Sequence, residues 1–596
     1  MEDKNKSKIN EKVDDYFEES INFSNFKSQQ MKDKLNLRKN KIFNKLFNKR
    51  KENFENNIKG PHEIDINSLN LDENIKKDID NYLKNNYEIK KWFKYIFSSN
   101  KNEVYVALYL LNRYIELQII ELKIKERLLS RNDTELIQKM ADNLLSDDLK
   151  ISYISCKILT NLTSFPIYIE NRIYSEKNLE KYLKFFERVV KDISLYTPKA
   201  LILFNNISTN DNVKIYLIKH NFIQGLFDFI KNILNNQIKF FNDLYELETI
   251  KYCIRIILHL ILVCSLIDPN YMKYFTSFIP FLKIITNKYF VNVDNIAFNE
   301  KECYDIISLW ILFADFDDEE KKIKREIIKD NFTQVLTKFY KKMKNINYKI
   351  SIAKIFCYLS TIGDDGDKIL INDGFLSLLS EEIEKYQYSN VNLLNYLIYC
   401  VSNLSLGTIG ENNKLIHLGI IYKIMDIAIF YIDDKLDEEV KCLLLGCLNS
   451  LTNNIFGIYR DTKKEIITYK NNLIIKIFCK ALKLELKEFE KEGIIAKIIL
   501  AINDLNVISE EIDIEKEKEY DLTCINNSLV EILNNIYNKN NLEDAVKSTI
   551  TDIIDFIKDK EENKIKNNNI NINLNKKNLN PKTFNKKQDL KYFAKL

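Results

Sequence analysis

Three stretches of the chain repeat one pattern: FNNISTNDNVKIYLIKHNFIQGLFDFI (residues 204–230), FCYLSTIGDDGDKILINDGFLSLLSEEI (356–383) and SNLSLGTIGENNKLIHLGIIYKIMDIAI (402–429). Each begins at the end of an apolar helix and crosses a polar break rich in Gly, Asn and Asp. It then continues through a short helix and a turn into another apolar helix. The turn falls at Asn221, Gly374 and Gly419, residue types that tolerate a positive φ. The chain is therefore predicted to repeat one helical unit.

The period of the repeat narrows the fold class. Equivalent positions are expected at Asn161, Asn206, Ser265, Ala314, Tyr358, Asn403 and Asn449. Their spacings of 45, 59, 49, 44, 45 and 46 residues are typical of armadillo or HEAT repeats. We predict an all-α, right-handed armadillo superhelix of about nine or ten repeats, an α-solenoid whose concave face is lined by one helix per repeat.

The composition agrees with this fold. The 596 residues include only 11 Gly and 6 Pro, too few for the turns of a sheet protein of this length. Ten cysteines without a CxxC pair indicate reduced thiols in the core. The longest apolar run, residues 256–267, is too short to span a bilayer, so we expect a soluble protein without membrane insertion.

Charge divides the chain into three segments. Residues 1–85 are polar, and residues 27–59 carry eleven Lys and Arg against three Asp and Glu, a net charge of +8. We expect this part to be a flexible basic arm with a short helix over about residues 32–55, followed by a linker. Residues 86–558 form the predicted repeat domain, and the Asn- and Lys-rich residues 559–596 form a tail expected to be loose.

A basic arm in front of such repeats resembles importin-α (karyopherin-α), the nuclear-import adaptor family. LRKNKIFNKLFNKRK (residues 37–51) is similar to the importin-β-binding segment of that family, and VSNLSLG (401–407) and LIKH (217–220) extend the resemblance into the repeats. The resemblance implies that the arm binds importin-β. It also implies that the arm competes with cargo for the chain's own groove when importin-β is absent. The arm residues concerned are Arg38, Lys39, Lys41, Lys45, Lys49, Arg50 and Lys51.

In the importin-α family, a W-x-x-x-N pair recurs along the groove. The indoles hold the stems of Lys or Arg side chains of an extended ligand, and the Asn amides bind its backbone. Here the Asn positions are kept, but the Trp positions read Lys157, Ile202, Tyr399 and Leu445. Trp310 remains, with Ala314 in place of its Asn. The resemblance places in the groove Asn161, Asn206, Trp310, Lys354, Asp364, Tyr399, Asn403 and Asn449.

Structural interpretations of the same residues stay open. An Asn near a helix end is often a local cap, and an aromatic residue in an apolar helix, such as Trp310 or Tyr399, is commonly part of the core. The arm is equally compatible with a solvated tail, or with a localisation signal read by another adaptor. Four scattered histidines give no metal-ligand spacing, and no catalytic motif or cofactor site is expected.

These patterns predict a divergent nuclear-import adaptor, a binding protein and not an enzyme, that shuttles between cytoplasm and nucleus. Its expected partners are importin-β, cargo with basic localisation signals, nucleoporins, and an export receptor at the last repeats. The main alternative is an armadillo scaffold that has lost the binding of such signals. Nucleic-acid binding by the two basic ends is a third, weaker interpretation, and no nucleic acid is expected as a partner.

Overall fold

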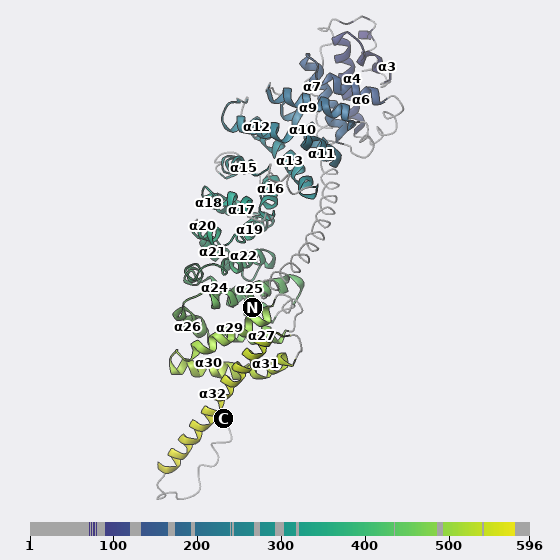
Figure 1. The fold of residues 1–596 in the computed structure, drawn as a ribbon. Coiled ribbons are helices and arrows are strands. Elements are labelled where there is room, and N and C mark those ends of the chain that lie inside the picture. Colours follow the sequence, from purple (N-terminus) through teal and green to yellow (C-terminus); the bar gives the residue numbers. More distant parts are fainter. Residues whose placement is uncertain are drawn as a thin grey trace, which may run out of the picture. The chain divides into compact units, whose positions relative to one another are not determined.

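The computed structural model describes a series of segments between residues 71 and 578. These are residues 71, 73, 75–77, 79, 90–119, 133–164, 173–191, 197–238, 240, 243–267, 275–291, 303–316, 321–372, 374–433, 436–484, 493–538 and 542–578. Every regular element in these segments is a helix (Figure 1). The fold is an all-α solenoid of armadillo repeats, as the sequence predicts. The basic arm, residues 27–59, lies outside the described residues.

The chain divides into two compact units. The first unit consists of the chain up to Phe229 together with the later segment Ile238–Val263. The second unit consists of the short segment Ile230–Gln237 and the chain from Cys264 onward. The helices of the first unit, with α12 and α13 extending beyond it, are α3 (Lys90–Ile96), α4 (Lys101–Ile119), α6 (Asp133–Asn143), α7 (Leu149–Thr163), α9 (Glu176–Lys191), α10 (Thr197–Ile207), α11 (Asp211–Lys219), α12 (Phe222–Leu234) and α13 (Asp243–Ile267).

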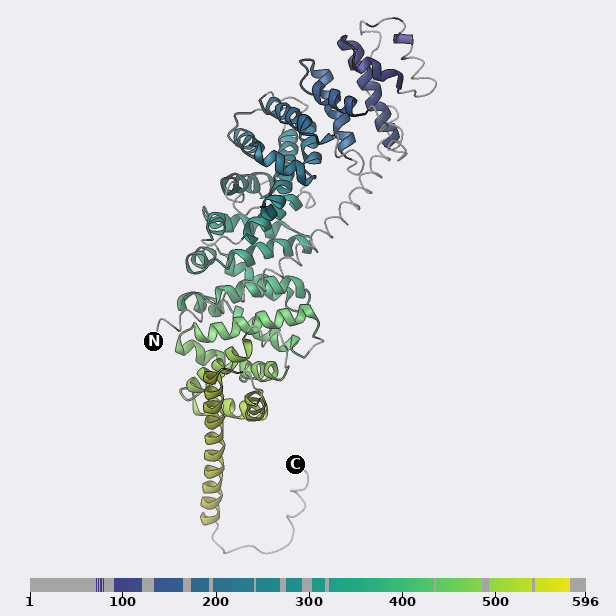
Figure 2. The ribbon, with the colours of Figure 1, turned by 45° about the vertical axis from the view of Figure 1, so that its right-hand side comes forward.

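The second unit repeats a trio of helices, seen as successive layers in Figures 1 and 2. Its elements are α15 (Ile279–Ile285), the π-helix η3 (Thr286–Val291), α16 (Tyr304–Asp315), α17 (Lys322–Ile328), α18 (Phe332–Lys342), α19 (Ile346–Leu359), α20 (Asp364–Asn372), α21 (Phe375–Tyr386), α22 (Val391–Leu404), α23 (Ile409–His417), α24 (Ile420–Tyr431), α25 (Glu438–Phe456), α26 (Arg460–Thr468), α27 (Leu473–Lys483), α29 (Ile494–Ser509), α30 (Ile514–Asn526), α31 (Leu529–Tyr537) and α32 (Asp544–Asn578).

The third helix of each repeat builds the continuous part of the stack. In the first unit α4 packs on α7 and α7 on α10, and in the second unit α16, α19, α22, α25, α29 and α32 pack in sequence. With α13, the described residues contain ten such third helices, in agreement with the predicted nine or ten repeats. Because each helix is covered by its neighbours, the core runs along the stack.

The turn between the first and second helix of a repeat requires the left-handed region. Asn221, Gly374 and Gly419 have φ values of 58°, 80° and 72°, which confirms the predicted turns. The same position in other repeats is filled by Asn331, Asn472 and Ser528, with φ values of 55°, 59° and 57°. The sequence signal is less obvious there because Asn and Ser also occur in many other contexts.

The C-terminal boundary differs from the prediction of a tail starting at residue 559. Helix α32 continues through that position to Asn578. Its first half is anchored in the core by Ile550, Ile553 and Ile557, which are at most 4% exposed. Once a helix is nucleated, each further residue adds a hydrogen bond, so the helix continues into a segment whose composition alone predicts no core contact.

Candidate peptide-binding faces

Each third helix leaves one stripe of side chains uncovered by its neighbours. We call these stripes, taken together within one unit, the third-helix face of that unit. In the first unit the face contains Tyr105, Tyr109, Lys150, Tyr153, Lys157, Asn161, Lys199, Ile202, Asn206, Tyr252, Arg255 and His259, all half-buried or exposed. In the second unit it contains Asp315, Lys354, Tyr358, Tyr396, Tyr399, Asn403, Asn449 and Asn453.

Two of the predicted Asn residues are held in the same way in different units. Asn206 on α10 donates from Nδ2 to the Thr160 carbonyl oxygen (3.1 Å), and Asn403 on α22 donates to Ser360 Oγ (2.9 Å) and to the Cys357 carbonyl oxygen (3.4 Å). Each amide therefore caps the third helix of the preceding repeat. Both residues are only half-buried.

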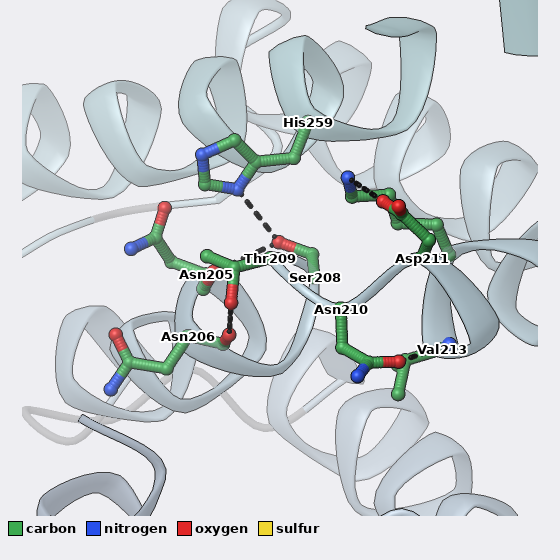
Figure 3. A network of polar contacts seen from close by, with 9 residues as sticks. Asn205, Asn206, Ser208, Thr209, Asn210, Asp211, Val213 and His259 are labelled. Carbon is green, nitrogen blue, oxygen red and sulfur yellow. Dashed lines mark hydrogen bonds and ion pairs between the residues drawn. The ribbon is translucent and has the colours of Figure 1, made fainter. Parts of the chain in front are cut away.

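The side-chain oxygens of these amides differ from the nitrogens in their contacts. Among the described residues no donor reaches Oδ1 of Asn206 or of Asn403, although each Nδ2 is engaged. Asn161 follows the same pattern, donating from Nδ2 to Asn112 Oδ1 at 3.2 Å. Figure 3 shows the end of α10, where the Asn206 side chain points away from the 3.0 Å contact between Ser208 Oγ and His259 Nδ1. Such an amide can accept one backbone N–H from an extended chain.

The expectation for Asn449 is wrong in register. Asn206 and Asn403 donate to the carbonyl oxygen of the residue that precedes their equivalent in the repeat before. On α25 this contact is made by Asn453, whose Nδ2 lies 3.5 Å from the Ser402 oxygen. Asn449 lies one turn earlier and accepts a hydrogen bond from Lys497 Nζ (2.8 Å). Because α25 is 19 residues long and α22 is 14, the periodic pattern fits both turns equally well.

Trp310 does not line a groove. Its side chain is fully buried (0% exposed), its Nε1 donates to Thr286 Oγ1 at 2.9 Å, and its ring centroid lies 4.6 Å from that of Phe332. Its expected partner Ala314 is equally buried. The sequence register on α16 is therefore shifted by one residue, because a stretch such as ISLWILFA, apolar except for Ser308, presents no polar stripe to fix its orientation.

Asp315, and not Ala314 as the repeat spacing predicts, is the residue of α16 that lies on this face. It is exposed and hydrogen-bonds to the Tyr358 side chain on α19. Burial, followed by the charge of Asp315, raises the pKa of the Tyr358 hydroxyl well above its ordinary value. Tyr358 therefore stays protonated and donates to the carboxylate. The sequence signal for Asp315 is a charged residue directly after an apolar helix pattern, one residue beyond Ala314.

Tyrosines gather around this carboxylate. Burial raises the pKa of Tyr396, and the Cys357 and Asp315 side chains add to the shift. Lys354 Nζ lies 5.2 Å from the Tyr358 ring centroid, which places the predicted Lys354 on this face. We call Asp315, Tyr358, Tyr396 and Tyr399 the tyrosine patch of the second unit.

Tyr399, the aromatic member of the best predicted pair, lies on α22 against α25. A Cβ added at Gly446 on α25 would be 3.8 Å from its Cδ2, an ordinary van der Waals distance, so the ring lies beside this part of α25. Tyr399 remains half-buried rather than enclosed. Asp364 begins α20, and its side chain lies outside the described set.

No group of three or more His, Cys, Asp or Glu side chains in the described part of the chain has a geometry that could hold a metal ion. No helix in the described segments combines the length and apolarity needed to cross a membrane.

Comparisons with known proteins support the fold. The sequence matches no protein-family model and no curated protein. An engineered protein from the Northeast Structural Genomics Consortium aligns over 79% of this chain and 99% of its own, with a TM-score of 0.53 and 12% identity. A chain solved in work on a phosphorylation switch that controls the interaction between cadherin and beta-catenin aligns over 79% and 94%, with a TM-score of 0.53 and 10% identity.

Armadillo proteins designed for modular peptide recognition are also similar over part of the chain. One of them aligns over 47% of this chain and 99% of its own, with a TM-score of 0.35 and 14% identity. Identities this low describe architecture and not activity. By helix order, turn geometry and structural neighbours, the chain has the fold of an armadillo-repeat solenoid.

Proposed function

We propose that this scaffold is a divergent nuclear-import adaptor that shuttles between cytoplasm and nucleus. In this proposal the third-helix face of the second unit holds an extended basic signal, and the basic arm binds importin-β. The observation that carries the proposal is the half-buried amide of Asn403, anchored through Nδ2 and next to the tyrosine patch, where an extended chain can be held by its backbone.

The tyrosine patch supplies the side-chain part of the recognition. A Lys or Arg side chain of the ligand can lay its stem along Tyr396 or Tyr399 and direct its charge to the exposed Asp315 carboxylate. Each cation–π contact contributes about 0.5–2 kcal/mol. With tyrosines in one region and no exposed Trp among the described residues, the proposal implies a weaker signal peptide complex than a full indole ladder would give.

The arm is tested by capture of importin-β with the full chain. Replacing Arg38, Lys39 and Lys41 with Ala is expected to reduce capture strongly, because coupled folding of a basic arm on an acidic surface is driven by charge. Three exposed lysines on the repeats, Lys341→Ala, Lys385→Ala and Lys516→Ala, remove the same charge elsewhere. Equal capture by the wild-type chain and the arm variant, at low salt, would reject the adaptor role.

The competing function is a scaffold without signal binding, and the burial of Trp310 favours it. The two are separated by titrating a labelled basic peptide against Tyr399→Ala and Asp315→Asn variants of the full chain. The adaptor proposal expects both variants to weaken binding by about fivefold to tenfold, since each removes about 1 kcal/mol of a partly desolvated contact. Wild-type affinity in both variants favours the plain scaffold.

A further inference from the structure

The third-helix face of the first unit carries the opposite charge to the groove that a basic signal requires. Its cations are Lys150 and Lys157 on α7, Lys199 on α10 and Arg255 on α13. The exposed Glu248 carboxylate on α13 acts on Lys199. Helix α13 also bears Glu246 and Lys251. In the family pattern the rings of the protein hold cations of the ligand, whereas here the protein brings its own cations.

Two of these cations lie near a tyrosine ring of the preceding third helix, and a third lies near a tyrosine ring of its own helix. Lys150 Nζ lies 5.8 Å from the ring centroid of Tyr105 on the preceding third helix. One repeat later, Lys199 Nζ lies 5.3 Å from the centroid of Tyr153 and donates to its hydroxyl at 2.8 Å. On α13, the guanidinium carbon of Arg255 lies 5.7 Å from the Tyr252 centroid. We call these residues the lysine–tyrosine ladder.

Lys199 keeps its charge at neutral pH. Partial burial lowers the pKa of Lys199, but the hydrogen bond to Tyr153 and the nearby Glu248 carboxylate outweigh burial, and the net pKa lies above the ordinary value. Lys150 and Lys199 are both exposed, so their ammonium groups are accessible from solvent.

The same face carries acceptors for a polypeptide backbone. Asn161 and Asn206 lie on α7 and α10, the helices that bear Lys157 and Lys199, and their Nδ2 atoms are already engaged with the protein. Their Oδ1 atoms can accept peptide N–H groups. A phosphodiester backbone has no N–H to offer to these oxygens.

We propose that the lysine–tyrosine ladder of the first unit is a docking surface for an extended acidic segment of a partner protein. The carboxylates of the segment pair with Lys150, Lys199 and Arg255, and its main chain donates to the amides of Asn161 and Asn206. This site lies in a different unit from the tyrosine patch and has the opposite ligand charge. It therefore does not depend on the import function proposed above.

The test uses the full chain and a fluorescent peptide of alternating glutamate and serine, with a glutamine and serine peptide as the neutral probe. Lys150→Gln combined with Lys199→Gln is expected to weaken binding of the acidic probe about tenfold, and to flatten its salt dependence, because two exposed ion pairs are lost. Lys150→Arg combined with Lys199→Arg keeps the charge and is expected to bind within about twofold of wild type.

The matched control removes two charges from another surface of the same unit. Lys184→Gln with Lys191→Gln on α9 changes the net charge equally, and Lys184 is 58% exposed. All variants retain the basic arm, so any binding of the probe to the arm cancels in the comparison. Unchanged helical circular dichroism and thermal midpoint confirm that the ladder variant is folded.

Three outcomes overturn the proposal. In the first, the ladder variant binds the acidic probe as tightly as wild type. In the second, the α9 control loses as much affinity as the ladder variant, which would make the interaction general charge attraction. In the third, a single-stranded oligonucleotide binds more tightly than the peptide and its binding is lost with Lys150 and Lys199, which would assign the face to nucleic acid. Failure of importin-β capture leaves each of these results unchanged.

Discussion

Single residues show how burial decides between a core role and a binding role. Trp310 has the residue type of a groove position, yet it is enclosed, whereas Asp315, five residues further on, is exposed and faces Tyr358. Both lie on α16, at angles that differ by more than a quarter turn around the helix axis. The type of a side chain therefore does not show whether it lines the groove. Its angular position around the helix axis does.

The first prediction concerns the fully buried indole of Trp310. Trp310→Ala is expected to lower the free energy of unfolding by about 3–5 kcal/mol, because it opens a cavity and leaves Thr286 Oγ1 without its indole donor. Trp310→Phe is expected to cost less, since it preserves most of the volume. Urea denaturation measures both. A loss of basic-peptide binding with unchanged stability would instead return Trp310 to the groove.

The second prediction concerns the alkaline stability of buried thiols. Burial raises the pKa of Cys156 from its ordinary 9.0 to about 12. In the unfolded chain this thiol ionises near pH 9, while the folded state keeps the proton, so stability falls as pH rises from about 9 to about 12, by about 1.4 kcal/mol per pH unit. Below pH 9 the thiol has no effect on the slope.

The measurement compares the wild type with Cys156→Ala at several pH values. The wild type is expected to lose its stability advantage over the variant as pH rises above about 9, while the two curves run parallel below it. Cys442→Ala is the control, because that thiol is exposed. Parallel curves through about pH 11 would contradict a protonated buried thiol.

At the scale of the element, backbone conformation explains why different residues serve the same turn. Gly419 and Ser528 occupy the same left-handed position before the second helix of their repeats, at φ values of 72° and 57°. Glycine adopts this conformation without steric cost, whereas a side chain costs about 1–2 kcal/mol there. Ser528 is therefore a strained turn.

The third prediction follows from this strain. Ser528→Gly is expected to stabilise the protein by up to about 1 kcal/mol, and Gly419→Ala to destabilise it by about 1 kcal/mol, although nothing lies within 4 Å of the added Cβ. The opposite signs are read from the thermal midpoints of the two variants. Stabilisation by Gly419→Ala would show that chain entropy, and not the left-handed turn, dominates.

Register within α25 gives a fourth prediction. If Asn453 and not Asn449 is the equivalent of Asn403, then Asn453→Ala is expected to weaken binding of a basic peptide about threefold to tenfold, through loss of one backbone hydrogen bond of about 1 kcal/mol. Asn449→Ala should leave the affinity within about twofold, because its Oδ1 already accepts from Lys497. The reverse order in fluorescence titrations would restore the sequence register.

For the molecule as a whole, the two units present faces of different character. The first combines four cations with tyrosines, and the second places tyrosines around Asp315. An armadillo stack allows this because each repeat contacts only its neighbours, so the side chains of one stripe can change without disturbing another. A single chain can thus carry two peptide sites of opposite preference.

The fifth prediction tests this separation. Lys150→Gln with Lys199→Gln is expected to reduce binding of an acidic peptide and leave basic-peptide affinity within about twofold, whereas Asp315→Asn should do the reverse. Each variant serves as the folded control for the other. If both variants lowered the affinity for both peptides, the faces would be coupled and the assignment of one ligand charge to each unit would fail.

The sequence by itself determined the fold class, the repeat period and the turns at Asn221, Gly374 and Gly419. These follow from local signals, namely apolar periodicity and tolerance of positive φ, that neighbouring segments cannot cancel. It also selected Asn206 and Asn403, because a polar residue at a helix end stands out in an apolar pattern. The basic arm could be recognised by its charge, and its binding to importin-β stays a prediction.

Only the tertiary structure decided the rest of the candidate site. The burial of Trp310, the one-residue shift to Asp315, the one-turn shift to Asn453 and the lysine–tyrosine ladder all depend on how consecutive third helices pack. An apolar helix has nearly the same pattern when it is rotated by one residue or moved by one turn, so its own sequence leaves the orientation open. Contacts between repeats, made by residues about 45 positions apart, remove that ambiguity.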